Sequence, residues 1–439
     1  MSDRPTNVRG TGRRLLRRGA QGVRRTVARR PRLFFYLAIL GPGVITANAG
    51  NDAGGIATFA SVGADHGYKL LWILVPLTLS LGIVQEMCAR MGAVTGKGLA
   101  DLIRERFGVR WTALVMLALL IANGGVTVSE FVGIAAAMEL FGVARYISVP
   151  IAAIAIWWLV VKGSYKRIER VFLVMSLVFL GYIVSAFLAH PGWGTVAREV
   201  VHPHFDLTPA YLFTIVAIVG TTISPYMQVF IQSSVVEKGV RVETYPFTRA
   251  DVWIGTLFSN ATVFFIVVCT AATLYVHGDH VDTASEAARA LRPLAGPYAE
   301  ILFAIGLFGA SMLAAGVLPL ATAYSISEAL GFEKGVSSSF REAPIFLGIF
   351  TFLVALGASI AMIPELPFIR VLLVTQVING LLLPVILIAI LRLVNNPDLM
   401  GKHVNGPVYN VAAWLTTIIV SALSLLFIII SIKPGLFQR

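Results

Sequence analysis

Long apolar stretches separated by short polar segments dominate the chain. Most of them are long enough for a helix to cross a bilayer core, which takes about 20 residues for about 30 Å. Eleven predicted spans have the approximate bounds 34–61, 69–95, 111–140, 147–162, 170–190, 209–236, 250–277, 297–331, 343–364, 367–393 and 410–433. The pattern predicts an all-α polytopic membrane protein.

Two of these spans are interrupted by residues that break helices. The first contains "NAGNDAGGIATF" (residues 48–59), in which Asp52 stands among glycines and other small residues. The sixth contains "IVGTTISPYMQVFIQSS", in which Ser224 precedes Pro225. Proline removes a helical N–H donor and disfavours helical geometry at the residue before it. We therefore predict unwound first and sixth helices.

The two interruptions lie five spans apart, which is typical of a transporter site built from an inverted repeat. We predict that spans one to five (34–190) form one repeat and spans six to ten (209–393) the other, with span eleven (410–433) added. A lone carboxylate in lipid costs at least about 2.5–3.5 kcal/mol, so we expect Asp52 to bind a cation beside freed backbone carbonyls. The alternative is that Asp52 only caps the second half of the first span.

Charge is unevenly distributed along the chain. The net charge is +12, and residues 1–33 hold eleven arginines against Asp3 alone. We expect this basic cytoplasmic arm to fix topology and to bind anionic lipid rather than nucleic acid. Loops after even-numbered spans are also the richer in Lys and Arg. The sequence therefore predicts a multi-pass protein of a bacterial inner or plasma membrane, with a cytoplasmic N-terminus and an external C-terminus, and we expect a monomer.

Four sequence runs carry a family resemblance when they are taken together. They are "GPGVITANAGNDAGGIATFASVGADHGYKLLW" at span one, "CARMGAVTGKGLADL" after span two, "SEFVGIAAAMELF" in span three and "TQVINGLLLPVIL" in span ten. Most of the chain after residue 34 resembles the natural resistance-associated macrophage protein (NRAMP) family of proton-coupled manganese and iron transporters. The resemblance implies a LeuT-type fold.

The chain departs from this family at its functional motifs. Where the family reads DPGN, this chain keeps Asp52 but has Gly55 in place of the asparagine. Where the family reads MPH, Ser224 replaces the metal-binding methionine and Tyr226 replaces the histidine. The resemblance implies further ion contacts from the backbone carbonyls of Ala49 and Thr221 and from the side chain of Gln376.

These replacements favour a hard ion. A thioether prefers transition metals, whereas Ser224 and the carbonyls offer oxygen alone. Mg²⁺ requires octahedral oxygen at about 2.0–2.1 Å and gives up water reluctantly, and we expect Gly55 to leave room for that water. The pattern resembles the bacterial NRAMP-related magnesium transporters. We predict alternating-access transport of a partly hydrated Mg²⁺, and also of Mn²⁺, without a bound cofactor.

The expected proton path is altered as well. The family has an aspartate three residues before a glutamate in span three, whereas this chain keeps Glu130 but has Thr127 at the earlier position. Tyr226 is a poor proton shuttle in place of histidine, and residues 343–363 of span nine contain no ionisable side chain. We predict uncoupled transport. Asn379 either lines the path or bonds to a neighbouring helix.

Three alternatives stay open. The chain could be a proton-coupled Mn²⁺/Fe²⁺ transporter of the usual NRAMP type, a transporter of an organic solute, or a membrane sensor that has lost transport. Asp52 would repel a solute carboxylate, and no long polar output region follows span eleven. No nucleophile elbow, phosphate loop or metalloprotease helix is visible in the sequence, so we expect no enzyme.

Overall fold

The described part of the chain is helical. The computed structural model describes residues 42–162, 180–206, 208–289, 299–335, 339–364 and 366–432, together with residue 296. The basic arm, the first residues of span one and residues 170–179 of span five lie outside these ranges. The predictions made for those segments stay predictions.

Within the described residues, nine helical segments are long and apolar enough to cross a membrane, and they correspond to predicted spans two to four and six to eleven. The helices at the spans are α3 (Pro42–Ala49), α4 (Ala53–His66), α5 (Leu74–Thr95), α7 (Val109–Glu139), α8 (Arg145–Lys162), α10 (Leu180–Leu188), α12 (Pro209–Thr222), α13 (Pro225–Glu237), α14 (Tyr245–Thr273), α17 (Ala299–Leu330), α18 (Pro344–Ala361), α19 (Phe368–Val394) and α21 (Pro407–Ile432). Between them lie η1 (Leu71–Ile73), α6 (Leu99–Phe107), α11 (Trp193–Val201), η3 (Tyr275–His277), α15 (Ala284–Arg289), α20 (Pro397–Met400) and η5 (Gly401–His403).

The first and sixth spans are both broken, as predicted. α3 ends at Ala49 and α4 begins at Ala53, with Asp52 in extended geometry just before α4. α12 ends at Thr222 and α13 begins at Pro225, with Ser224 in extended geometry just before the proline. The geometry before the proline is the one that steric contact with its ring favours.

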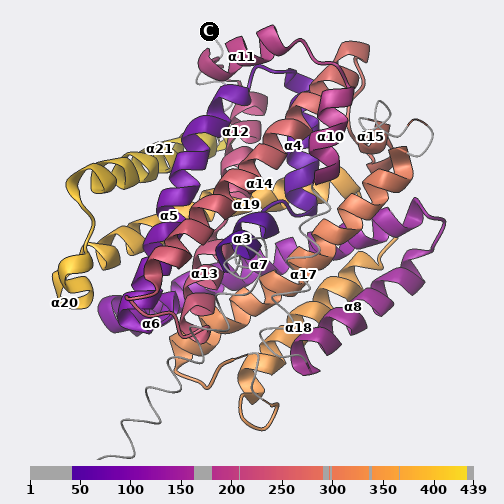
Figure 1. Ribbon diagram of the computed structural model, residues 1–439. Coiled ribbons are helices and arrows are strands. Elements are labelled where there is room, and N and C mark those ends of the chain that lie inside the picture. Colours follow the sequence, from indigo (N-terminus) through magenta and orange to yellow (C-terminus); the bar gives the residue numbers. More distant parts are fainter. Residues whose placement is uncertain are drawn as a thin grey trace, which may run out of the picture. The chain divides into compact units, whose positions relative to one another are not determined.

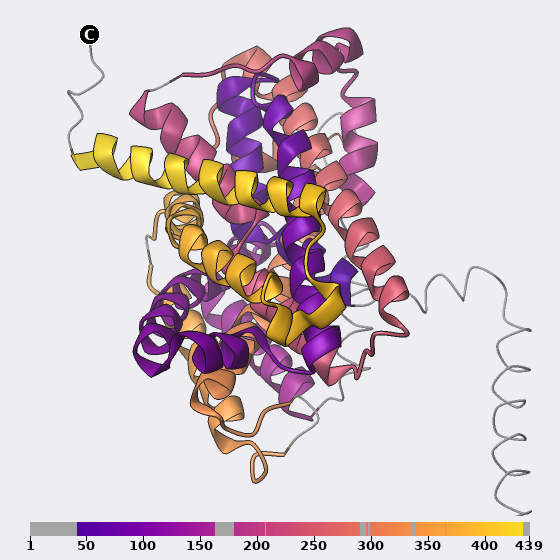
Figure 2. The same ribbon diagram turned by 90° about the vertical axis from the view of Figure 1, so that its left-hand side faces the viewer.

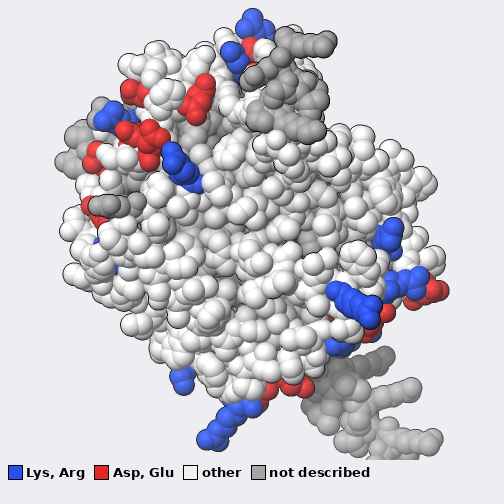
Figure 3. Space-filling view, turned by 180° about the vertical axis from the view of Figure 1, so that it is seen from behind, with Lys and Arg blue, Asp and Glu red and all other residues white. Residues whose placement is uncertain are grey.

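The broken helices lie inside the bundle (Figures 1 and 2). α3 and α4 pack on α14, α12 packs on α19, and α13 packs on α5 and α17. α8 and α18 lie at one side of Figure 1, and α21 lies at the other. On the face shown in Figure 3, charged side chains gather toward the margins and leave a broad uncharged belt between them. Such a belt is the surface that a hydrocarbon core requires.

α3 and α14 come into backbone contact through two glycines. A Cβ added at Gly255 of α14 would lie 2.7 Å from the Gly43 carbonyl oxygen and 2.7 Å from Val44 Cα. One turn earlier in α14, Asp251 accepts hydrogen bonds from the backbone N–H groups of Gly43 (2.7 Å) and Val44 (3.4 Å). These N–H groups belong to the first turn of α3 and have no partner within that helix. Asp251 therefore caps the first half of the broken span.

A second buried carboxylate joins three helices at the predicted cytoplasmic end. Glu328 of α17 is 1% exposed, and its Oε1 accepts a hydrogen bond from Ser233 Oγ of α13 (2.6 Å) and pairs with Lys334 Nζ (3.2 Å). Its Oε2 accepts a hydrogen bond from the Ala100 N–H of α6 (3.2 Å). The second half of the sixth span, α13, is thus tied to α17 and α6 by directional contacts.

We expect Gly255→Ala to lower the free energy of unfolding by about 1–3 kcal/mol, the usual cost of overpacking, because the new methyl group must push the α3 backbone away. Gly348→Ala in α18 is the control, since a Cβ there meets no atom within 4 Å. That control should keep or slightly raise stability. Thermal unfolding of the purified variants in detergent is the measurement. Equal melting temperatures for the two variants would contradict the backbone contact between α3 and α14.

Candidate metal-ion site

Asp52 occupies the break between α3 and α4 and is 1% exposed. Its Oδ1 accepts hydrogen bonds from the Gly55 N–H (2.5 Å) and from Gln376 Nε2 of α19 (3.4 Å). Its Oδ2 is buried and has no hydrogen-bond partner. Asp52 does cap α4, as the alternative interpretation held, but capping uses only one of its oxygens. A buried acceptor without a donor is costly, and a bound cation would offset that cost.

Three oxygen atoms converge at Gly55. A Cβ added there would lie 2.7 Å from the Gly50 carbonyl oxygen, 3.0 Å from Thr221 Oγ1 and 3.2 Å from Asp52 Oδ1. Thr221 Oγ1 is buried and has no hydrogen-bond partner. The expectation that Gly55 leaves open room is therefore corrected, because these oxygens already surround the place of the missing side chain.

Ser224 and Tyr226 use their hydroxyl groups to contact the backbone at the two breaks. Ser224 Oγ donates to the Gly220 carbonyl (2.6 Å) and also approaches the Thr221 carbonyl (3.3 Å). Tyr226 is fully buried, and its hydroxyl donates to the Ala49 carbonyl (2.8 Å). The Ala49 carbonyl therefore already accepts a hydroxyl proton, and the Thr221 carbonyl shares the single proton of Ser224 with the Gly220 carbonyl. Each has only its second lone pair to offer an ion.

Glu130 of α7 reaches the same half-helix as Asp52. Its side chain is fully buried, and its Oε2 accepts the Ala53 N–H (3.1 Å), the first N–H of α4. Two carboxylates therefore face the N-terminus of α4, where the helix dipole favours negative charge. The structure thus brings Glu130 beside the Asp52 segment.

Two predicted pathway residues lie less directly at the site. Thr127 Oγ1 donates to the carbonyl of Asn123 in its own helix (2.7 Å), so its hydroxyl is used locally. Asn379 Nδ2 donates to Gln376 Oε1 (3.3 Å), and Gln376 in turn contacts Asp52. Asn379 is therefore linked to the carboxylate through Gln376.

A cavity of about 10 Å³ lies beside the break in the first span. This volume is about the smallest that can hold one water molecule. Six of its lining residues are Gly50, Asn51, Thr221, Met227, Ser259 and Asn260.

The sequence interpretation missed Met227, whose methyl group fills the place of a Cβ at Gly50. The prediction of an all-oxygen environment therefore needs correction, because a thioether lies near the break. Its sulfur is 3.8 Å from Gln85 Nε2, which donates to it.

The donor set is nevertheless dominated by neutral oxygen. Among the described residues, no three His, Cys, Asp or Glu side chains gather in a way that could hold a metal ion. Cys88 and Cys269 are both buried, and the Cys269 thiol shares a hydrogen bond with Ser185 Oγ (3.3 Å). One carboxylate among carbonyl and hydroxyl oxygens is typical of sites for Mg²⁺, Ca²⁺ or Mn²⁺.

Comparison with known proteins fits this arrangement of broken helices. A profile of the family described as natural resistance-associated macrophage protein-like matches residues 43–430. The chain belongs to the NRAMP family.

Two curated NRAMP relatives illustrate the extent of the similarity. The divalent metal cation transporter MntH of Deinococcus radiodurans is 26% identical over 420 residues, which covers 92% of this chain and 90% of that relative. The protein of the same name from Ralstonia nicotianae is 28% identical over 437 residues, which covers 92% of this chain and 94% of that relative.

Solved structures confirm the LeuT-type fold predicted for this NRAMP chain. The Eremococcus coleocola manganese transporter, in complex with an aromatic bis-isothiourea substituted compound, superposes with a TM-score of 0.71 at 21% identity and covers 89% of this chain and 86% of its own. Mhp1, a nucleobase-cation-symport-1 family transporter in a closed conformation, superposes with a TM-score of 0.54 at 13% identity, covering 89% and 90%. At these identities the likeness shows the fold alone.

We expect Gly55→Ala to weaken Mn²⁺ binding about tenfold or more, because a 1–3 kcal/mol overpacking cost at the convergent oxygens corresponds to that factor. Gly125→Ala in α7 is the control, since a Cβ there meets only Thr375 Cγ2 at 3.6 Å. Calorimetric titration of the purified variants with Mn²⁺ is the measurement. If Gly55→Ala bound Mn²⁺ as tightly as the control, the oxygens around Gly55 would have no part in ion binding.

Proposed function

We propose that the chain transports divalent metal cations across a membrane, with Mg²⁺ as its preferred ion and Mn²⁺ as a second substrate. One observation carries the proposal, namely the buried Asp52 Oδ2, which has no hydrogen-bond partner at the break in the first span. The names of the relatives, divalent metal cation transporter and manganese transporter, support the same class of ion. None of these names describes an enzyme.

The preference for Mg²⁺ is supported by the oxygen atoms that converge at Gly55, close to Asp52. Thr221 Oγ1 is without a partner, and the Gly50 carbonyl points to the same place beside Gly55. Mg²⁺ keeps several of its waters when it binds, and the small cavity beside Thr221 accommodates one. The nearby sulfur of Met227 already accepts a weak hydrogen bond from Gln85, so it is less available as a soft ligand.

Transport without proton coupling is supported by the hydrogen bonds of two polar side chains near Asp52, which are made to backbone carbonyls. Thr127 donates to its own helix and Tyr226 donates to the Ala49 carbonyl. α18 (Pro344–Ala361) contains no ionisable residue, so it offers no proton relay leading away from Glu130. A proton is also not needed for accumulation, since a divalent cation gains about 4.6 kcal/mol per 100 mV on entry.

Proton-coupled Mn²⁺/Fe²⁺ transport of the usual NRAMP type is the second candidate. Two observations favour it. Glu130 shares the N-terminus of α4 with Asp52, and a thioether lies near the break at Met227. The two candidates differ in whether protons move with the metal.

The proposal also includes the predicted arrangement in the membrane. The N-terminus would be cytoplasmic, the C-terminus external, and residues 1–33 would lie on anionic lipid. The repeats at 34–190 and 209–393 would move relative to each other in a monomer, giving alternating access to Asp52.

Uptake by protein in liposomes tests the ion and the coupling together. With an inward metal gradient and a negative internal potential, we expect Mg²⁺ and Mn²⁺ uptake without internal acidification. Asp52→Ala should reduce uptake to the level of protein-free liposomes, because it removes the carboxylate whose Oδ2 is free for the ion. Asp65→Ala, which removes an exposed carboxylate paired with His280, is the control and should keep transport. Acidification in proportion to Mn²⁺ entry would favour the proton-coupled candidate instead.

The role of Ser224 can be tested by competition between the two ions. We expect Ser224→Met to shift the ratio of Mn²⁺ to Mg²⁺ uptake toward Mn²⁺ by about tenfold, which corresponds to about 1.4 kcal/mol from a soft ligand. Ser224→Ala is the matched control, because it removes the same hydroxyl without adding sulfur. An unchanged ratio in Ser224→Met would show that position 224 does not contact the ion.

A further inference from the structure

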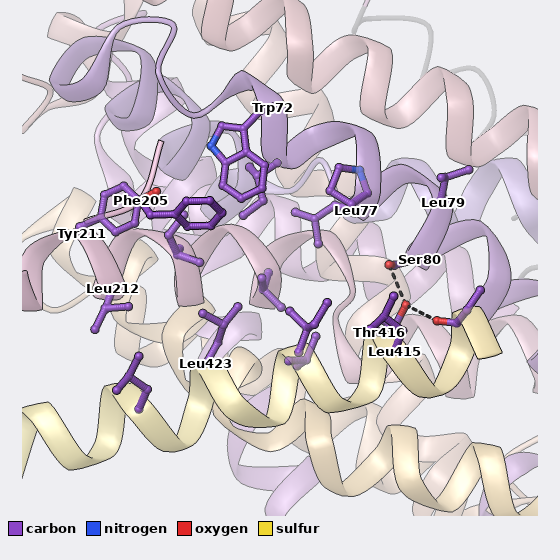
Figure 4. A pocket seen from close by; sticks show the side chains of 18 of the residues that line it. Trp72, Leu77, Leu79, Ser80, Phe205, Tyr211, Leu212, Leu415, Thr416 and Leu423 are labelled. Atoms are coloured by element: carbon purple, nitrogen blue, oxygen red, sulfur yellow. Dashed lines mark hydrogen bonds between the residues drawn. The ribbon is translucent and has the colours of Figure 1, made fainter. Parts of the chain in front are cut away.

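An apolar groove of about 620 Å³ lies between α5, α12 and α21 (Figure 4). Its volume is within the range of about 300–1,000 Å³ that is usual for ligand pockets. Hydrocarbon side chains make up most of its wall, among them Leu77, Leu212, Ile215, Val219, Ile419 and Leu423. The groove is separate from the ion site at Asp52, none of whose predicted ligands lines it.

The groove is continuous with the membrane-facing surface. Only 28% of the apolar window of α21 is buried inside the protein. The lining residues Leu79, Leu415 and Ile419 are 55%, 55% and 49% exposed. All three helices of the wall are membrane spans, so the solvent that meets this opening is lipid hydrocarbon rather than water.

The two ends of the groove differ chemically. At one end, Trp72 and Phe205 make an edge-to-face contact with ring centroids 5.0 Å apart, and Tyr211 lies beside them (Figure 4). The exposed Asp206, which follows Phe205 in the sequence, also lines the groove. Aromatic side chains of this kind gather at membrane–water interfaces. At the other end, the hydroxyls of Ser80 and Thr416 bond to each other (2.9 Å), and Thr416 Oγ1 also lies 3.0 Å from the Ala412 carbonyl oxygen, so both hydroxyls have partners.

Trp72 lines the aromatic end of the groove with its ring rather than with its N–H group. Its Nε1 is buried and has no hydrogen-bond partner in the described structure. The indole N–H of a buried tryptophan usually has an acceptor. Because protein atoms cover Nε1, a lipid in the groove does not reach it, and the aromatic rings of Trp72, Phe205 and Tyr211 alone assign this end of the groove to the membrane interface.

We propose that this groove binds one acyl chain of a phospholipid, with its ester region at Trp72 and its methyl end toward Ser80 and Thr416. The lining residues of α21 run from Ala412 to Leu426, which is roughly 21 Å along a helix. The hydrocarbon of one bilayer leaflet is about 15 Å thick. A single chain that enters obliquely therefore matches the groove in length, polarity and the position of its polar end.

An acyl chain in this position would support the outer half of the broken sixth span. Leu212, Ile215 and Val219 belong to α12, and Val219 lies two residues before Thr221. Occupancy of the groove would therefore affect where α12 places Thr221. This consequence rests on the proposed function, whereas lipid binding itself does not.

Photolabelling of the full-length protein in liposomes tests the proposal. Two phosphatidylcholines serve as probes, one with a diazirine near the ester and one with a diazirine at the chain end. Peptide mass spectrometry should find the first probe near Trp72 and Phe205 and the second near Thr416. We expect labelling about tenfold above that of lipid-facing α8 residues such as Ile154 (67% exposed), which corresponds to about 1.4 kcal/mol.

Substitution of adjacent residues in α21 provides the matched comparison. Ile419→Trp fills the groove and should reduce its labelling to the level of α8. Ile418→Trp should leave labelling unchanged, because Ile418 is 59% exposed and does not line the groove. Equal labelling of groove and α8 in the wild-type chain would mean ordinary surface lipid only and would overturn the proposal, as would a reversed order of the two probes. The assay needs no metal, so its outcome is independent of the proposed transport.

Discussion

A carboxylate at membrane depth is tolerated only if the backbone around it changes, and Asp52 is the residue on which this structure depends. The helix stops before it, so that Oδ1 can accept the Gly55 N–H at the start of α4. Gln376 approaches the same oxygen from α19, and Glu130 approaches the same helix end from α7. Oδ2 keeps its lone pairs. The break that stabilises the carboxylate therefore also leaves one of its oxygens free for a cation.

Each half-helix that begins inside the membrane requires acceptors for the N–H groups of its first turn, because these groups have no partner in their own helix. α3 meets this requirement with Asp251, and α4 meets it with Asp52 and Glu130. α13 begins at Pro225, which has no N–H to satisfy. Of these solutions, only the one at Asp52 leaves a buried carboxylate oxygen without a partner. That difference separates a possible ion site from structural capping.

The spans and their breaks were predictable because hydrophobic length and proline geometry are local properties of the sequence. The hydrogen-bond partners of the side chains at the two breaks were not predictable, because most of these partners are distant along the chain. Tyr226 reaches Ala49 and Met227 fills the space at Gly50, and both partners lie in the first span. Ser224 is the exception, since it donates to Gly220, four residues earlier. Asp251 and Glu328 could have been found, because an ionisable residue inside a span is by default a functional candidate.

The two halves of the sixth span are held in different ways. α13 is fixed by directional contacts, since Ser233 donates to the buried Glu328, which also pairs with Lys334. On its lipid side, α12 borders an apolar groove, where packing alone provides stability because hydrocarbon offers no hydrophobic driving force between helices. Breaking the polar contacts of α13 would strand a buried carboxylate. α12 is held instead by close backbone contact with α19, because a Cβ added at Gly220 would lie 2.0 Å from the Gln376 carbonyl oxygen and one added at Gly380 would lie 2.6 Å from the Val216 carbonyl oxygen. The first half of the sixth span is therefore held by close packing of backbones, and the second half by buried polar contacts.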